Sequence, residues 1–180
     1  MENEAEKKLS NKMIYIIVII IVVTLLVTTN LFEIGRVSGI SMKPTLYNND
    51  MIIKMHYPNI FINKPKRNSV ITFRAPHNSK YSFGKRVVGL PGDEILIESG
   101  IVYLNGEVLD EYYIDETTMT HTERYTEWVV PEEHVFVLGD NRQIGGSSDS
   151  RSYGFIPQSD ITGYVIFVIS PDSERRGFIK

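Results

Sequence analysis

Residues 95–109 read Ile-Leu-Ile-Glu-Ser-Gly-Ile-Val-Tyr-Leu-Asn-Gly-Glu-Val-Leu. Two short apolar runs, 95–97 and 101–104, are separated by Ser-Gly, and Asn105-Gly106 returns the chain through Val108-Leu109. Asn-Gly is a strong hairpin signal because both residues tolerate positive φ. The stretch therefore predicts three short antiparallel strands joined by tight turns.

Similar apolar runs bounded by turn residues occur on both sides of this stretch, at 51–55, 70–73, 135–138 and 164–169. No convincing amphipathic helix follows residue 32. We therefore expect a mainly β chain in which residues 33–180 form one antiparallel, partly closed β domain. Residues 110–134, which are largely polar over 117–126, are expected to be an excursion outside the core.

Residues 13–32 contain no charged side chain. Twenty residues in a helix span about 30 Å, the hydrocarbon thickness of a bilayer, and a lone strand in lipid would leave its backbone unpaired. A cleavable signal peptide is the competing interpretation, but the run is long and residues 27–30 offer no small-x-small cleavage site. We predict a retained transmembrane helix that leaves the chain in contact with the lipid bilayer.

Orientation follows from the basic residues that flank the span. Lys7, Lys8 and Lys12 precede it, whereas Arg36 and Lys43 follow it. This excess predicts that residues 1–12 are cytoplasmic and that the β domain lies on the extracytoplasmic side of the cell membrane.

Composition excludes several classes of function. The net charge is −3 with no basic block, so no nucleic-acid partner is expected. The chain has no cysteine, which excludes disulfides, thiolate metal sites and a cysteine nucleophile. The four histidines are scattered without metal-binding spacing, and no phosphate loop or dinucleotide motif occurs. We predict no cofactor and no metal.

The first candidate site is Ser41-Met42-Lys43-Pro44-Thr45-Leu46, just beyond the apolar span. Gly39 allows a close backbone approach, and apolar Ile40 and Met42 flank the serine. A serine hydroxyl becomes a nucleophile when a nearby base removes its proton, and a desolvated lysine can be that base. An ordinary Ser-x-x-Pro turn is the alternative interpretation.

A candidate base opens the run Lys85-Arg86-Val87-Val88-Gly89-Leu90-Pro91-Gly92-Asp93. Most Lys-Arg pairs are solvated, but this pair enters an apolar segment in which one side of a strand must be buried. Burial can lower a lysine pKa by about 3–5 units. We expect Lys85 to be buried with a polar partner at its tip.

The third candidate is the polar segment that begins Gly139-Asp140-Asn141-Arg142 and continues to Arg151. If this segment is extended, Ser147, Asp149 and Arg151 point to the same side. The acid and the arginine could then pair and brace the site, and the serine could hydrogen-bond Lys85. A polar surface loop is the alternative interpretation.

Together, Ser-Met-x-Pro-Thr-Leu, Lys-Arg-Val-Val-Gly-Leu-Pro-Gly-Asp and Gly-Asp-Asn-Arg…Ser-x-Asp-Ser-Arg resemble the motifs of the bacterial type I signal peptidases, or leader peptidases. The resemblance includes the order of the motifs and the N-terminal anchor, and covers essentially the whole chain. The single anchor resembles the form found in Gram-positive bacteria.

The resemblance implies a serine endopeptidase with a Ser-Lys dyad, which removes signal peptides from exported preproteins. Ser41 would be the nucleophile and Lys85 the general base. Ser147 would orient Lys85, and Asp149 would pair with Arg151 and, as a second partner, with Arg86. The supporting positions also include Gly139, Asp140 and Asn141. Substrate would bind extended, with small residues at the first and third positions before the cut, along Gly39, Ile40, Met42, Phe83 and Gly84.

Two departures from the family pattern leave questions open. Six residues, rather than four, separate Arg142 from Asp149, so either Ser147 or Ser148 could meet Lys85. Gly39 stands where some relatives have a serine that stabilises the oxyanion, so the second oxyanion donor is not assigned. A pilus-dedicated or other Ser-Lys processing peptidase, and an inactive membrane-anchored binding module, remain as alternatives.

Overall fold

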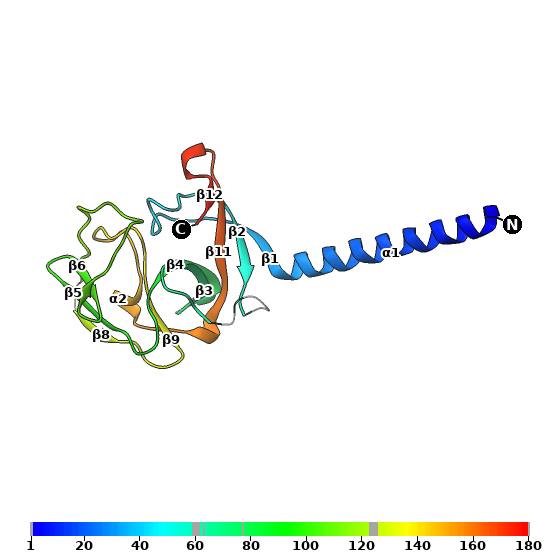
Figure 1. Ribbon diagram of the computed structural model, residues 1–180. Helices are drawn as coiled ribbons and strands as arrows, with labels where there is room; N and C mark the ends of the chain where they lie inside the picture. Colours follow the sequence, from blue (N-terminus) through cyan, green and yellow to red (C-terminus); the bar gives the residue numbers. More distant parts are fainter. Residues whose placement is uncertain (1, 59–61, 63, 77, 123–125, 180) are drawn as a thin grey trace.

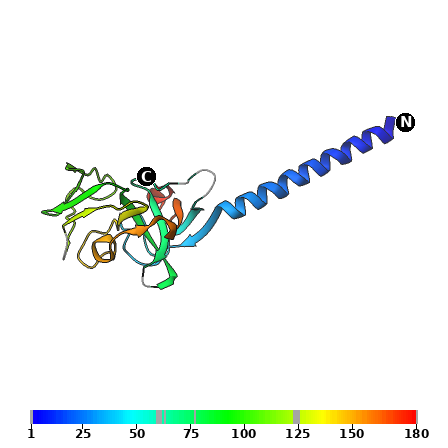
Figure 2. The same ribbon diagram turned by 90° about the horizontal axis from the view of Figure 1, so that it is seen from below.

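The computed structural model describes residues 2–58, 62, 64–76, 78–122 and 126–179 (Figure 1). A long N-terminal helix, α1 (Glu2–Leu31), projects away from a β domain in both views (Figures 1 and 2). Among the described residues, α1 is the one helix long and apolar enough to cross a membrane, over Lys12–Leu31. It contains the predicted helix 13–32 except for Phe32, and it extends N-terminally to Glu2. Phe32 begins β1 because its backbone pairs with Met55.

The larger sheet has the order β1-β2-β11-β3-β4-β9-β10, with β12 paired to β11, and all of its pairs are antiparallel. Its strands are β1 (Phe32–Arg36), β2 (Met51–His56), β3 (Val70–Ala75), β4 (Asn78–Gly89), β9 (His134–Leu138), β10 (Ile156–Pro157), β11 (Ile161–Ile169) and β12 (Gly177–Phe178). The hydrogen-bonded order ends at β1 and β10 in the described part of the chain, so the sheet is open between them.

The smaller sheet has the order β7-β6-β5-β8 and contains the stretch that predicted the hairpins. Its strands are β5 (Glu94–Glu98), β6 (Ile101–Leu104), β7 (Glu107–Val108) and β8 (Glu127–Val129). Both connecting turns use positive φ, at Ser99 and Gly100 and again at Asn105 and Gly106. The predicted hairpins and the mainly β, antiparallel fold are therefore confirmed. The remaining elements are α2 (Ser150–Tyr153) and the 3-10 helices η1 (Gln158–Asp160) and η2 (Ser173–Arg175).

Strand β4 is buried on both faces and separates two parts of the core. Val87 packs in one hydrophobic cluster with Ile71 and Val137, whereas Val88 packs in another with Ile95 and Phe136. Successive side chains of a strand point to opposite faces. Lys85 therefore shares the face of Val87, and its neighbour Arg86 shares the face of Val88.

The predicted excursion, 110–134, is not wholly outside the core. Strand β8 pairs with β5, and Val130 is buried in the same cluster as Val88. Thr120 is buried as well. Residues 123–125 of the excursion lie outside the described part of the chain. The polar composition of 117–126 predicted the wrong boundary because the pairing of β8 with β5 depends on a strand about thirty residues earlier.

Candidate active site

The loop between β1 and β2 presents Ser41 from a fixed position. Met42 and Leu46 are buried in a core cluster with Ile52. The backbone N–H of Gly39 donates to Asn48 Oδ1 at 3.0 Å. Ile40 remains exposed. Of the two apolar neighbours of the nucleophile, Met42 therefore anchors the loop in the core and Ile40 faces outward.

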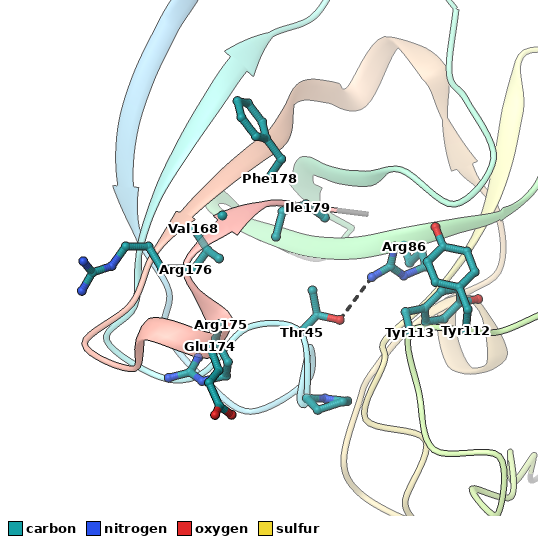
Figure 3. Close-up of a pocket in the computed structure, with 12 residues that line it drawn as sticks. Thr45, Arg86, Tyr112, Tyr113, Val168, Glu174, Arg175, Arg176, Phe178 and Ile179 are labelled. Carbon is teal, nitrogen blue, oxygen red and sulfur yellow. Dashed lines mark hydrogen bonds between the residues drawn. The ribbon is translucent and has the colours of Figure 1, made fainter.

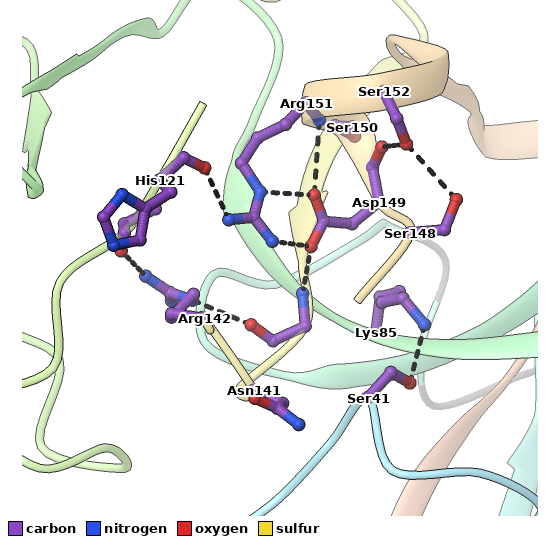
Figure 4. Close-up of polar contacts among 12 residues, drawn as sticks. Ser41, Lys85, His121, Asn141, Arg142, Ser148, Asp149, Ser150, Arg151 and Ser152 are labelled. Carbon is purple, nitrogen blue, oxygen red and sulfur yellow. Dashed lines mark hydrogen bonds and ion pairs between the residues drawn. The ribbon is translucent and has the colours of Figure 1, made fainter. Parts of the chain in front are cut away.

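Lys85 on β4 lies directly against Ser41. Its side chain is 4% exposed, and Nζ donates to Ser41 Oγ at 2.9 Å and to the carbonyl oxygen of Gly84 at 3.0 Å (Figure 4). The predicted burial of Lys85 and the polar partner at its tip are both confirmed.

The environment of Lys85 favours the neutral amine. Burial lowers the pKa of Lys85 from 10.5 to about 8, while the charges of Asp149 and Asp140 oppose the decrease and the charge of Arg151 adds to it. Burial dominates because desolvation penalises the ammonium form alone. A sizeable fraction of Lys85 is therefore able to act as a base at mildly alkaline pH.

Arg86 points to the other face of β4, where it contacts Thr45 in the loop that carries Ser41. Its guanidinium donates from Nε to Asp140 Oδ1 at 2.9 Å and from Nη2 to Asp140 Oδ2 at 2.8 Å. Nη2 also donates to Thr45 Oγ1 at 3.2 Å, and Thr45 donates to Asp140 in turn. Arg86 thus pairs with Asp140, and the predicted Arg86–Asp149 pair is wrong.

Thr45 and Arg86 also line a cavity of about 580 Å³. Figure 3 shows the residues around this cavity and the hydrogen bond between Thr45 and Arg86. The ring of Tyr113 stacks on Arg86, with the guanidinium carbon 3.9 Å from the ring centroid. Neither Ser41 nor Lys85 lines this cavity, so it is separate from the dyad.

Asp149 pairs with Arg151 as predicted. Nε and Nη2 of Arg151 each donate to the carboxylate at 2.7 Å, and Asp149 Oδ2 also accepts from the backbone N–H of Gly139 at 2.9 Å (Figure 4). The predicted extended segment does not reach Arg151, however, because α2 begins at Ser150, directly after its N-cap Asp149. Arg151 Nη1 donates to the carbonyl oxygen of His121 at 2.8 Å.

Gly139 and Asn141 lie against the backbone of Ser41 and Ile40. The N–H of Asn141 donates to the Ser41 carbonyl oxygen at 3.0 Å, and Asn141 Nδ2 donates to the Ile40 carbonyl oxygen at 3.2 Å. A Cβ on Gly139 would lie 2.5 Å from the Ser41 oxygen and closer still to Ser147 Oγ. Only glycine leaves room for this close approach.

The predicted hydrogen bond from Ser147 or Ser148 to Lys85 is not formed. Ser147 Oγ is buried and has no hydrogen-bond partner among the described residues. Ser148 Oγ instead lies 3.2 Å from Ser152 Oγ (Figure 4). Between Arg142 and Asp149 the chain makes a turn, closed by Gly146 N–H donating to the Gln143 carbonyl oxygen at 2.8 Å. Because this part of the chain is a turn and not a strand, the alternation that placed Ser147 on the face of Asp149 and Arg151 does not apply.

Sequence reasoning missed a buried contact between the third motif and the excursion. Arg142 is fully buried and donates from Nε to the Gly139 carbonyl oxygen at 2.7 Å, from Nη1 to Thr120 Oγ1 at 2.8 Å, and from both terminal nitrogens to the Glu111 carboxylate. Tyr113 also donates to Glu111, and burial raises the pKa of the Tyr113 phenol. No sequence signal marks this contact, because Glu111 and Arg142 are 31 residues apart.

A cavity of about 160 Å³ opens beside Ser41. Its walls are mostly small or apolar and include Gly35, Val37, Ile52, Gly84 and Val165. Of the residues predicted to bind substrate, Gly39, Met42 and Gly84 line this cavity. Phe83 lines a separate cavity of about 250 Å³, and exposed Ile40 lines neither.

A serine hydroxyl in contact with a buried lysine of lowered pKa is the arrangement of a serine–lysine hydrolase. The family model for the signal peptidases, peptidase S26, matches residues 10–170. Signal peptidase I of Bacillus caldolyticus is 37% identical over 146 residues, which cover 73% of this chain and 75% of the relative. Signal peptidase I P of Bacillus subtilis subsp. natto is 33% identical over 184 residues, with 95% and 96% covered.

The probable signal peptidase I-2 of Synechocystis is 35% identical, but the match spans only 62% of its length and 76% of this chain. A crystal structure of a signal peptidase I from Enterococcus faecalis V583 is 33% identical, with a TM-score of 0.48 over 58% of this chain and 98% of that one. The chain belongs to the signal peptidase family, peptidase S26, whose members are serine endopeptidases.

Proposed function

We propose that this protein is a membrane-anchored signal peptidase that removes N-terminal signal peptides from exported preproteins, with Ser41 as nucleophile and Lys85 as general base. The observation that carries the assignment of roles is the 2.9 Å contact between Lys85 Nζ and Ser41 Oγ, in a site where burial lowers the lysine pKa to about 8. The names of the relatives support the substrate class.

In the acylation step, neutral Lys85 takes the hydroxyl proton of Ser41 as Oγ attacks the carbonyl carbon of the scissile bond. The carbon–nitrogen bond then breaks, and the Lys85 ammonium gives its proton to the leaving amine. The carbonyl oxygen of Gly84 holds Nζ in place through its 3.0 Å hydrogen bond. Lys85 next takes a proton from water as the water oxygen attacks the acyl carbon. The carbon–Oγ bond then breaks, and the Lys85 ammonium returns the proton to Ser41 Oγ.

The backbone N–H of Ser41 is proposed to stabilise the oxyanion of the tetrahedral intermediate. A preorganised donor of this kind contributes about 3–4 kcal/mol. This N–H belongs to the Ile40–Ser41 peptide unit, whose carbonyl oxygen accepts from Asn141 Nδ2 at 3.2 Å, and the next carbonyl oxygen, that of Ser41, accepts from the N–H of Asn141. Gly139 and Asn141 therefore act as positioning residues for the nucleophile, and Asp140 holds Thr45 both directly and through Arg86.

The residues before the cut are proposed to occupy the cavity of about 160 Å³. Glycines at positions 35, 39 and 84, together with valine and isoleucine side chains, leave an apolar space that fits small side chains. The preference for small residues at the first and third positions before the cut would follow from this limited volume. Large side chains would have to displace packed core residues.

We further propose that α1 spans the cell membrane, with residues 1–12 in the cytoplasm and residues 33–180 on the extracytoplasmic side. Strand β1 begins directly after the helix, and Gly35 and Arg36 of β1 line the substrate cavity. Five strand residues extend about 17 Å. The cavity would then lie close to the membrane surface, where a signal peptide emerges.

The test is cleavage of a preprotein with an Ala-x-Ala site by the detergent-solubilised full chain. Ser41→Ala and Lys85→Met should abolish cleavage. Ser148→Ala and Lys66→Met are matched controls, because Ser148 and Lys66 are exposed and lie outside the dyad. If Lys85→Met still cuts, the proposed general base is wrong. If the unaltered chain cuts no such preprotein between pH 6 and 10, the proposed substrate class is wrong.

A further inference from the structure

A second cavity opens beside the turn that precedes Asp149, and neither Ser41 nor Lys85 lines it. It has a volume of about 490 Å³, and the two cavities share no lining residue. One wall is the turn between Arg142 and Asp149, represented by Gln143, Ile144 and Ser147, and another is formed by Arg151 and Ser152 at α2. His121 closes the far side, and Figure 4 shows it facing the turn and α2 across the site.

Ser41 lines the small cavity and approaches one wall residue of the large cavity, Ser147. The Ser41 carbonyl oxygen and the Ser147 side chain both lie close to Gly139. A Cβ added to Gly139 would lie 2.5 Å from that oxygen and 2.6 Å from Ser147 Cβ. Because Ser147 lines the large cavity, this cavity begins one side chain away from the nucleophile.

A peptide that is cut at Ser41 must extend to both sides of the attacked carbonyl group. If the small cavity takes the residues before the cut, the residues after the cut leave on the opposite side. We propose that the cavity of about 490 Å³ binds the first residues of the mature chain, and that Ile144 on its rim is a specificity-determining residue. This inference rests on the function proposed above.

The chemistry of the cavity predicts which mature chains it accepts. Ile144 is 79% exposed at the rim and offers an apolar contact. The walls carry the Arg151 guanidinium and the His121 imidazole, and none of the described lining residues is a carboxylate. The carboxylate of Asp149, which ends the turn, is buried and already accepts from Arg151. The cavity should therefore favour an acidic or uncharged polar side chain over a lysine.

The test uses peptides that are identical through an Ala-x-Ala site and differ only at the second residue after the cut, which is Glu or Lys. The readout is the ratio of kcat/KM for the Glu peptide to that for the Lys peptide. We expect a ratio above one for the unaltered chain. Ile144→Lys should raise the ratio and Ile144→Glu should lower it. The new charge should change kcat/KM by about two- to fivefold for each peptide that it attracts or repels. High salt should reduce both changes.

Ile101→Lys and Ile101→Glu are the matched controls, because Ile101 is an exposed isoleucine on β6 that lines neither cavity. A further control exchanges Ala for Val directly before the cut, and its effect should be equal in all Ile144 variants. If Ile144 variants change the Glu-to-Lys ratio no more than Ile101 variants do, the inference is overturned while the proposed function stands. If the unaltered chain cuts none of the peptides, the proposed function fails and the inference fails with it.

Discussion

Replacing Lys85 with methionine should make the folded protein more stable at neutral pH and less stable at high pH. In the folded chain the pKa of Lys85 is about 8, compared with 10.5 for an unperturbed lysine. At 1.36 kcal/mol per pH unit, this difference destabilises the charged folded state by about 3 kcal/mol. Solvent screens this penalty little, because Lys85 is only 4% exposed.

The direction of the pH dependence follows from proton binding. Below pH 8 the lysine is charged in both the folded and unfolded chains, so the whole penalty is present. Between pH 8 and 10.5 the unfolded chain binds more protons, so the free energy of unfolding of the unaltered protein rises with pH. Above pH 10.5 the amine is neutral in both states, and the penalty has disappeared.

Methionine avoids this penalty but loses the two hydrogen bonds that Lys85 makes to Ser41 and Gly84. Each such bond contributes about 1 kcal/mol. The free energy of unfolding of Lys85→Met should therefore be about 1–2 kcal/mol higher than that of the unaltered chain at pH 7 and about 2 kcal/mol lower at pH 11. The sign of the difference should reverse, because the charge penalty depends on pH and the loss of hydrogen bonds does not.

Urea unfolding of the detergent-solubilised chain, followed by the fluorescence of the single tryptophan, measures this difference. Trp128 packs against Phe136 in the core, with ring centroids 5.0 Å apart, so its emission reports the folded β domain. Lys66→Met is the control, because Lys66 is exposed. A difference between Lys85→Met and the unaltered chain that stays constant from pH 7 to 11 would refute the lowered pKa of Lys85.

Four further predictions concern the same site. Because the pKa of Lys85 is about 8 and the base must be neutral, kcat/KM of the unaltered chain should rise about tenfold between pH 7 and 9, measured with an Ala-x-Ala peptide. Gly139→Ala should destabilise the fold by about 1–3 kcal/mol and abolish most activity, because the new methyl group would lie 2.5 Å from the carbonyl oxygen of the nucleophile. Gly84→Ala, whose nearest neighbour would be 4.0 Å away, should keep its urea midpoint and raise KM by narrowing the substrate cavity. Asp140→Asn should cost about 3–5 kcal/mol in urea unfolding because its arginine partner is fully buried, whereas Asp160→Asn, in a solvent-exposed ion pair, should cost less than about 1 kcal/mol.

The elements that sequence predicted well are those whose structure depends on near neighbours. The hairpins of residues 95–109 follow from alternating apolar residues and from turn residues at 99–100 and 105–106, where the structure has positive φ. The helix followed from an uninterrupted apolar run. Its end at Leu31 did not, because the backbone of Phe32 is held by pairing with Met55 on a strand about twenty residues later.

The same distinction applies to the candidate site: features that depend on neighbouring residues were predictable, and contacts between distant segments were not. Burial of Lys85 was predictable because the apolar residues that follow it require a buried strand face, and its contact with Ser41 agrees with the order of the motifs. The partner of Arg86 was not predictable, because Asp140 reaches it only when β4 and β9 lie side by side. Alternation also misplaced Ser147, because a turn and not a strand precedes Asp149.

The amino-acid sequence alone determined the class of fold and the apolar helix, and it singled out Ser41 and Lys85, because periodicity, turn chemistry and motif order are properties of neighbouring positions. Only the tertiary structure decided which acid pairs with which arginine, that Glu111 meets Arg142, and that one cavity is lined by Ser41 and another by the turn before Asp149. These features depend on distances between segments that are far apart in the chain. Those distances are set when the strands pair and the core packs, and no local pattern encodes them.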